Sequence, residues 1–309
     1  MATIADSEFK LKESHGRGMN TLNEDYLLPA DEAEMQRLSI QHRMWQLMVG
    51  GLYPPEFEVA VGKALEGPEA TALDAGCGSA IWCIEMAQMY PQTHVVGVDL
   101  AKNFQQHPPA NFESIQADMS NGIAPCKNSG GYDLIHVRSV IYHMKDSEAF
   151  LRNVHSVLKP DGILILGDGN GLISGTDKEV LSPKYPTAPT EGESWLAGWQ
   201  QVWLELLRYS FKPMQELVEK SPFDIVASCE YFCPMGWDGG LENGAELGDI
   251  ALRNTVQWAR AAAPAILASK KYDTEMVDAW LDAIEDECKT KKFYLPWVIL
   301  LARPGGSSA

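Results

Sequence analysis

The chain has 309 residues, of which 45% are hydrophobic and 22% charged, with a formal net charge of −17 at pH 7. One α/β domain with insertions can account for this length, and there is enough apolar material for a sizeable core. The negative charge disfavours nucleic acid and an anionic membrane surface as partners, because both require a basic protein face.

The N-terminal part predicts a polar segment followed by one helix. Residues 1–30 are polar, and we expect their start to be frayed. Asp31 and the acidic residues after it are typical of a helix start, and apolar residues then recur at helical spacing. Gly50 and Gly51 end the helix. We predict residues 1–50 as an N-terminal cap on a main domain at 51–309.

Strands and helices alternate in the next hundred residues. Strands are predicted at 71–75, 94–98, 111–116, 132–137 and 163–167. Helices are predicted at 81–89 and 148–158, with a turn at 159–162. Short apolar strands joined by helices predict an α/β fold with a mostly parallel sheet covered on both faces.

The sequence changes in character after Asp168. Residues 169–193 are rich in Gly, Pro, Ser and Thr, which predicts a long loop. Further elements are predicted as helices at 195–218, 245–268 and 274–288, as strands at 225–233 and 293–302, and as a disordered tail at 304–309. Without an internal repeat or a clear linker, we expect one domain, with lid or substrate insertions at about 169–222 and 241–290.

The six cysteines and the lack of long apolar runs bear on location and metals. No cysteine pair has C-x-x-C spacing, so we expect free thiols and no metal site. Residues 1–19 lack the apolar stretch of a secretory signal, and no run reaches the ~20 apolar residues of a membrane span. These features predict a reduced, cytoplasmic protein.

The segment 73–79 combines a strand, a glycine turn and a helix start. Glycine lets the backbone approach a ligand, and a helix N-terminus offers free N–H groups. Asp99 ends the next strand, where a carboxylate can accept hydrogen bonds from both hydroxyls of a ribose. Ile81 stands where a dinucleotide motif needs a small residue, which disfavours an oxidoreductase. A tight turn without a ligand is the remaining alternative.

These segments resemble the motifs of class I S-adenosylmethionine-dependent methyltransferases, from about residue 68 to 168. The resemblance extends through 132–138 and 158–162, and it implies a seven-stranded Rossmann-like sheet with S-adenosylmethionine as the cofactor. It implies cofactor contacts from Asp74, Gly76, Gly78, Asp99, Leu100, Asp118, Met119 and Arg138. From its place at a strand end, Arg138 would either hold an anionic group or, as we favour, pair with a carboxylate. Ala80 departs from the family pattern, which often has a third glycine there.

A narrower resemblance links the start of the chain to the fungal LaeA-like methyltransferases. It rests on residues 26–29 and on the helix that follows, and it extends to the helical pair before the last strand. That group includes natural-product O-methyltransferases and regulators of secondary metabolism. The resemblance implies that Tyr26 covers the cofactor and that Gln41 lines the substrate pocket.

Three titratable side chains on or after the predicted central strands are assigned different roles. His143 follows the fourth strand at the ligand-binding edge of the sheet, so we predict that it removes a proton from the acceptor. A loop histidine with a local hydrogen bond is the alternative. His136 lies within a buried strand and is assigned a structural role. Asp168 ends the fifth strand at the same edge, either to orient substrate or to cap the loop.

Three tryptophans, Trp195, Trp199 and Trp203, recur every four residues and share one face of a predicted helix. We predict that they line the substrate pocket, while ordinary core packing is the alternative. An aromatic pocket suits a cationic methyl donor and an apolar or aromatic acceptor.

The sequence thus predicts a methyltransferase that acts on a small natural-product-like acceptor, preferably at oxygen. The alternative is a LaeA-like regulator that binds the cofactor and protein partners. Only short basic pairs, 270–271 and 291–292, are present, which disfavours a nuclear regulator because a targeting signal needs a longer basic run. The acceptor and the oligomeric state remain open.

Overall fold

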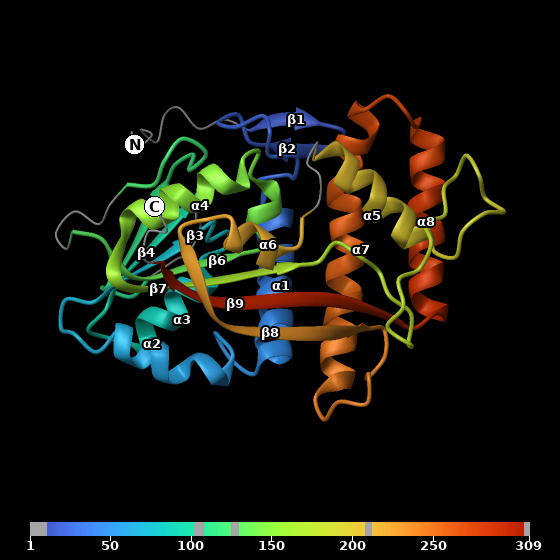
Figure 1. Cartoon of the computed structure of the whole chain (residues 1–309). Coiled ribbons are helices and arrows are strands. Elements are labelled where there is room, and N and C mark those ends of the chain that lie inside the picture. Colours follow the sequence, from blue (N-terminus) through green and yellow to red (C-terminus); the bar gives the residue numbers. More distant parts are fainter. Residues whose placement is uncertain (1–10, 102–107, 125–129, 208–211, 306–309) are drawn as a thin grey trace.

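A computed structural model describes residues 11–101, 108–124, 130–207 and 212–305. Seven strands form one sheet in the order β5-β4-β3-β6-β7-β9-β8 (Figure 1). Their bounds are β3 Thr71–Ala75, β4 His94–Asp99, β5 Phe112–Gln116, β6 Tyr132–Arg138, β7 Leu158–Gly169, β8 Phe223–Met235 and β9 Phe293–Pro304. Strands β3 to β7 pair in parallel, while β9 is antiparallel to both neighbours. The predicted seven-stranded, mostly parallel Rossmann-like sheet is confirmed.

Helices cover both faces of this sheet, with α2 and α3 on one side and α4 and α6 on the other (Figure 1). Their bounds are α1 Glu32–Val49, α2 Glu58–Ala64, α3 Ile81–Met89, α4 Ser147–Val157 and α6 Met214–Glu219. Successive side chains of β6 separate the two layers, because Leu134 packs with α1, α2 and α3 while Ile135 packs with α4 and α6. Because both faces of the sheet are buried, these strands contain runs of apolar residues and do not alternate apolar with polar side chains.

A third group of helices, α5 Trp195–Leu206, α7 Gly244–Ala268 and α8 Thr274–Thr290, packs beside the sheet (Figure 1). Its core includes Trp199 and Trp280, whose rings lie 5.1 Å apart in an edge-to-face arrangement. Helix α7 also packs along α1. The insertions between the later strands thus form one wall of the sheet's ligand-binding edge.

Helix α1 begins and ends where the sequence predicts. The Asp31 carboxylate accepts a hydrogen bond from the Glu34 N–H at 2.9 Å, as an N-cap does. Gly50 takes a left-handed conformation with φ 85° and closes the C-terminus. This helix carries several residues that line the site described below.

The structure differs from the sequence-based expectations at three places. Residues 159–162 belong to strand β7, with a register jump from Tyr132 opposite Leu158 to Leu134 opposite Ile163. The helix predicted at 195–218 is two helices, and residues 208–211 between them lie outside the described residues.

The third difference is a hairpin, β1 Lys12–Ser14 and β2 Arg17–Met19, in the polar N-terminal segment, where no strand was predicted. The start of that segment, residues 1–10, lies outside the described residues. Its turn residues His15 and Gly16 both have positive φ, as tight hairpin turns require. At the other end of the chain, Pro304 belongs to β9, and residues 306–309 of the predicted tail lie outside the described part. The division into a cap at 1–50 and a main domain at 51–309 stays a prediction.

Candidate active site

Two adjoining cavities lie at the carboxyl ends of the central strands. The glycine-turn cavity, of about 100 Å³, is lined by residues that include Asp74, Gly76, Gly78, Asp99, Asp118 and Arg138. The insertion cavity, of about 150 Å³, is lined by residues that include Arg37, Asp168, Trp203, Asn254, Trp258 and Trp297. Both cavities share Tyr26, Leu38, Gln41, Ser139 and His143 in their linings. The two cavities therefore meet at a common boundary.

The glycine turn brings the backbone close to the first cavity. Gly76 has φ 88°, and a Cβ there would lie 2.3 Å from Val140 Cγ2. Gly78 has φ 50°, and a Cβ there would lie 2.9 Å from Leu38 Cδ1. Ala80 also has positive φ, 56°, immediately before α3. The family's glycine at this position is thus explained by backbone conformation as well as by size, and alanine adopts it here with some strain.

Asp99 binds the backbone of the glycine turn, and Asp74 binds a buried histidine on the neighbouring strand. Asp99 accepts hydrogen bonds from the N–H groups of Gly78 and Ala101, each at 2.8 Å and each on a different carboxylate oxygen. Burial raises the pKa of Asp99. Asp74 accepts from His136 Nδ1 at 2.8 Å, and burial lowers the pKa of that histidine. His136 also stacks on Trp82 at 4.0 Å, which supports the structural role predicted for it.

The N-terminal segment contacts residues of the glycine-turn cavity. Leu100, Asp118 and Met119 belong to the lining, as does Asn23. The Asn23 side-chain amide donates to Asp118 Oδ1 at 3.3 Å and to Ser120 Oγ at 2.8 Å. Sequence analysis did not identify Asn23, because the contact joins segments 95 residues apart.

Arg138 does not pair with a carboxylate, contrary to the favoured sequence-based interpretation. Among the described residues it forms no ion pair; its Nη2 donates to His42 Nδ1 at 2.9 Å. Its guanidinium also lies 5.5 Å from the centre of a Trp45 ring. Because Nδ1 accepts this bond, His42 Nε2 donates to Glu85, at 3.0 Å. Burial lowers the pKa of Arg138 to about 10 and that of His42 to about 2.

His143 lies at the boundary between the two cavities, in the short 3₁₀ helix η2 (Ile141–His143). Its ring centre is 5.3 Å from Tyr26 and 6.2 Å from Trp203. Burial, with a smaller effect of the Arg37 charge, lowers the pKa of His143 to about 4. The imidazole is therefore neutral at pH 7 and a weak base.

The three tryptophans predicted to line a pocket are not brought together. Trp203 lines the insertion cavity, whereas Trp199 is fully buried against Trp280. Trp195 lies away from both cavities, and its carbonyl accepts a hydrogen bond from Trp280 Nε1 at 3.0 Å. Each four-residue step turns the helix face by about 40°. Because of this rotation, Trp203 points in a different direction from the other two. Of the three, only Trp203 lines the insertion cavity and can contact a substrate there.

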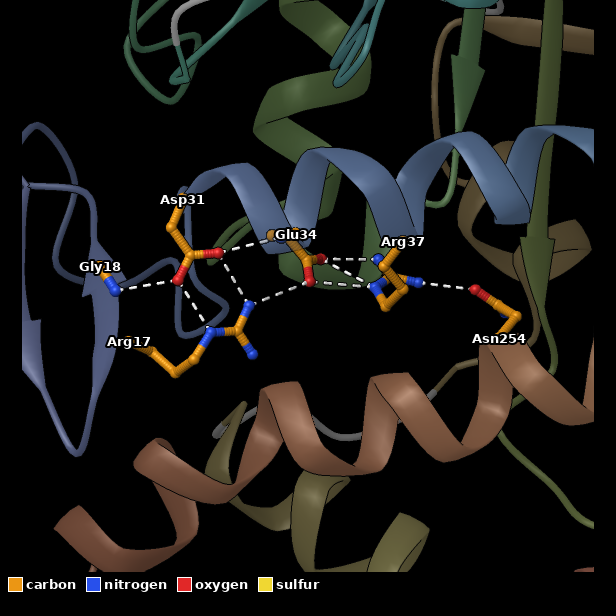
Figure 2. A network of polar contacts seen from close by, with 6 residues as sticks. All are labelled: Arg17, Gly18, Asp31, Glu34, Arg37 and Asn254. Atoms are coloured by element: carbon orange, nitrogen blue, oxygen red, sulfur yellow. Dashed lines mark hydrogen bonds and ion pairs between the residues drawn. The ribbon is translucent and has the colours of Figure 1, made fainter.

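A buried polar network connects helix α1 with helix α7 beside the insertion cavity (Figure 2). Arg37 donates to both carboxylate oxygens of Glu34 at 2.7 to 3.1 Å and to Asn254 Oδ1 at 2.9 Å. On the other side, Arg17 pairs with Asp31 at 2.8 Å. Helix α1 belongs to the segment that resembles the LaeA-like group, but the sequence did not predict this network.

The described residues contain no group of three or more His, Cys, Asp or Glu side chains placed to hold a metal ion. The helices of the described part also include none that is long and apolar enough to span a membrane.

Comparison with known proteins finds similarity to methyltransferases. Residues 57–203 match the family model described as a methyltransferase domain. The secondary metabolism regulator laeA of Coprinopsis cinerea is 32% identical over 54% of this chain and 41% of its own length. Methyltransferase str2 of Strobilurus tenacellus is 28% identical over 46% of this chain and 48% of its own length. The matches thus cover less than half the length of these curated relatives.

One solved structure with a similar fold is an S-adenosylmethionine-dependent methyltransferase of Geobacter sulfurreducens, 14% identical, with a TM-score of 0.44 over 85% of this chain and 98% of that chain. The segment 57–203 is therefore similar to methyltransferase domains, and its strand order is that of the Rossmann-like class. Its resemblance to the LaeA-like group, expected from the N-terminal motifs, is confirmed.

Proposed function

We propose that this chain binds S-adenosylmethionine in the glycine-turn cavity and methylates a small molecule held in the insertion cavity. The observation that carries the proposal is the shared lining of the two cavities, with Gln41, Ser139 and His143 at their boundary. Methyl transfer requires mainly that donor and acceptor be held in line and shielded from water. Two adjoining cavities meet this requirement.

The glycine-turn cavity has features that suit each part of the cofactor. Gly76 and Gly78 allow the ligand to approach a backbone that carries no side chain there. Asp99 is placed to accept bonds from the ribose hydroxyls, and Leu100 and Met119 to hold the adenine. Arg138, a half-buried cation without an ion pair among the described residues, suits the carboxylate of the cofactor. When bound, the cofactor supplies an electrophilic methyl group on a sulfonium.

The insertion cavity suits an apolar or aromatic acceptor, as the sequence predicts. Trp203 and Trp258 contribute aromatic surface, with ring centres 6.0 Å apart, and Gln41 adds a polar group at the boundary. Tyr26 packs on His143 and covers the junction. We propose oxygen as the methylated atom. We also propose a cytoplasmic protein with a small-molecule partner, because a net charge of −17 disfavours nucleic acid.

A second candidate function is regulation, because the relative from Coprinopsis cinerea is named as a regulator of secondary metabolism. A regulator of this kind would bind the cofactor and a protein partner. The two functions differ in one measurement, in which the protein is incubated with isotope-labelled S-adenosylmethionine and a fungal metabolite extract. An enzyme adds the labelled methyl mass to a metabolite, whereas labelling of protein alone, or no labelling, favours the regulator.

Replacement of Asp99 by alanine is expected to weaken S-adenosylmethionine binding by about 1–3 kcal/mol, because the ribose hydroxyls lose a charged acceptor. Isothermal titration measures this difference. Asp161→Ala, at an exposed carboxylate in β7, is the matched control and is expected to bind normally. Equal affinities of the Asp99→Ala and wild-type proteins would contradict the placement of the ribose. Binding of NAD in place of S-adenosylmethionine would contradict the function itself.

A further inference from the structure

Several polar atoms in the insertion cavity have no hydrogen-bond partner. Among the described residues, Ser139 Oγ, His143 Nδ1, Asp168 Oδ2 and Trp297 Nε1 are shielded from solvent and unbonded. All four residues line this cavity. Buried polar groups in proteins are nearly always hydrogen-bonded, so unbonded groups gathered in one cavity indicate that a ligand supplies their partners.

Among the described residues, Asp168 is the one carboxylate that lines the insertion cavity. It follows the paired part of β6 and β7, where the Ser139 N–H donates to the Gly167 carbonyl at 2.8 Å. Its Oδ1 accepts a hydrogen bond from the Gly169 N–H at 2.9 Å. The N–H groups of residues 140–142 lie near enough to the carboxylate to lower its pKa, but none of them makes a well-formed hydrogen bond to Oδ2. The residue as a whole is half-buried, but the Oδ2 atom is shielded.

The other charged or titratable groups that line this cavity do not neutralise Asp168. Arg37, on α1, is already paired with Glu34 and Asn254. Tyr142 and His143 lie on η2, and Tyr26 lies on the N-terminal segment. Helices α5 and α7 and strand β9 contribute only uncharged side chains to the described lining. A carboxylate in this setting suits a neutral proton donor.

We propose that Asp168 accepts the proton of a hydroxyl group on the acceptor while that oxygen receives the methyl group. This inference rests on the proposed methyltransferase function and names the acceptor as a hydroxyl-bearing, largely apolar molecule. The acceptor oxygen forms a bond to the methyl carbon as the carbon–sulfur electron pair returns to sulfur. The hydroxyl proton moves to Asp168 Oδ2, so charge and atoms balance.

The acid–base properties of the two candidate groups support Asp168 over His143. Burial raises the pKa of Asp168 to about 7, and the N–H groups of Gly169 and of η2 offset only part of that effect. A base is most effective when its pKa lies near the working pH. His143, with a pKa lowered to about 4 by burial, is the weaker base and is assigned to orienting the acceptor.

The test uses phenol and anisole as probes on protein saturated with S-adenosylhomocysteine. Phenol can donate a hydrogen bond to an ionised Asp168, whereas anisole has the same ring and no donor. Phenol stays protonated up to about pH 9. We therefore expect phenol affinity to rise roughly tenfold or more between pH 5 and 8.5, with its midpoint near pH 7, and anisole affinity to stay flat.

Asp168→Asn removes the titrating group and keeps the shape, so its phenol affinity is expected to be independent of pH. His143→Asn is the matched variant, and it should keep the pH dependence. In wild-type protein with ¹³C-labelled aspartate, one carboxyl resonance should titrate near pH 7 and shift to lower pH with phenol. This last measurement needs no variant to fold.

The inference is overturned if phenol fails to bind, if its affinity does not change with pH, or if the pH dependence disappears in His143→Asn and persists in Asp168→Asn. Tight benzylamine binding in place of phenol would overturn the hydroxyl class. S-adenosylhomocysteine binding, measured first, separates these outcomes from failure of the proposed function. If that ligand does not bind, the methyltransferase proposal itself is wrong.

Discussion

Replacement of Glu34 by alanine is expected to lower the free energy of unfolding by about 3–5 kcal/mol, because it leaves the Arg37 guanidinium buried without a counter-charge. Both side chains are nearly inaccessible, at 1% and 4% exposure. Figure 2 shows Glu34 between Arg17 and Arg37, with Asn254 on the far side. Removal of the carboxylate leaves the Asn254 amide oxygen as the remaining hydrogen-bond partner of Arg37 among the described residues.

An exposed ion pair between helices α1 and α7 provides a matched control. Arg43 on α1 pairs with Glu246 on α7 at 2.8 Å, and their side chains are 49% and 54% exposed. Water solvates both charges there, so Glu246→Ala is expected to change stability by about 0–1 kcal/mol. Chemical denaturation of both variants measures the difference. Similar small effects for the two variants would show that Glu34 is hydrated in solution.

The double variant Glu34→Leu/Arg37→Met tests the cause of the loss. Replacement of both charges by apolar side chains of similar volume removes the unpaired cation, so most of the lost stability should return. Glu34→Gln keeps the side-chain shape and serves where the alanine variant is too unstable to measure. Arg37 also lines the insertion cavity, so the double variant should alter phenol binding even if it is stable.

The sequence predicted those features that depend on neighbours along the chain. The glycine turn, the Asp31 cap and the strands of the central sheet are encoded in short segments with their own physical signals. The Arg37–Asn254 contact spans 217 residues, and no local pattern specifies it. The tryptophan spacing predicted a helix, which α5 confirms, but it could not show that Trp203 faces a cavity while Trp199 faces Trp280.

The candidate site follows the same division. The residues of the glycine-turn cavity were expected from motifs in order along the chain, and the structure gathers them. In the insertion cavity, Arg37 and Trp258 come from separate helices and were not predicted as substrate contacts. Asp168 was noticed from its strand end, but its shielded Oδ2 and raised pKa depend on packing from η2 and the insertions.

Gly76→Ala is expected to destabilise the protein by about 2–5 kcal/mol and to abolish measurable S-adenosylmethionine binding, through two separable effects. A left-handed conformation costs a non-glycine residue about 1–2 kcal/mol, and Gly76 has φ 88°. The new Cβ would also lie 2.3 Å from Val140 Cγ2, and such overpacking costs about 1–3 kcal/mol. Thermal unfolding and isothermal titration measure the two outcomes.

A second substitution separates the strain from the clash. In Gly76→Ala/Val140→Ala the contacting methyl group is absent, so the part of the loss caused by the clash should return while the backbone strain stays. Gly62→Ala is the control, because a Cβ there meets nothing within 4 Å. Position 62 lies inside α2, where alanine is more stable than glycine by about 0.5–1 kcal/mol, so this variant should be slightly stabilised. Full recovery in the double variant would show that φ at Gly76 relaxes. If neither stability nor S-adenosylmethionine binding recovers, the whole effect comes from the backbone conformation at Gly76. Cofactor binding would then depend on the shape of the turn and not on its packing against Val140.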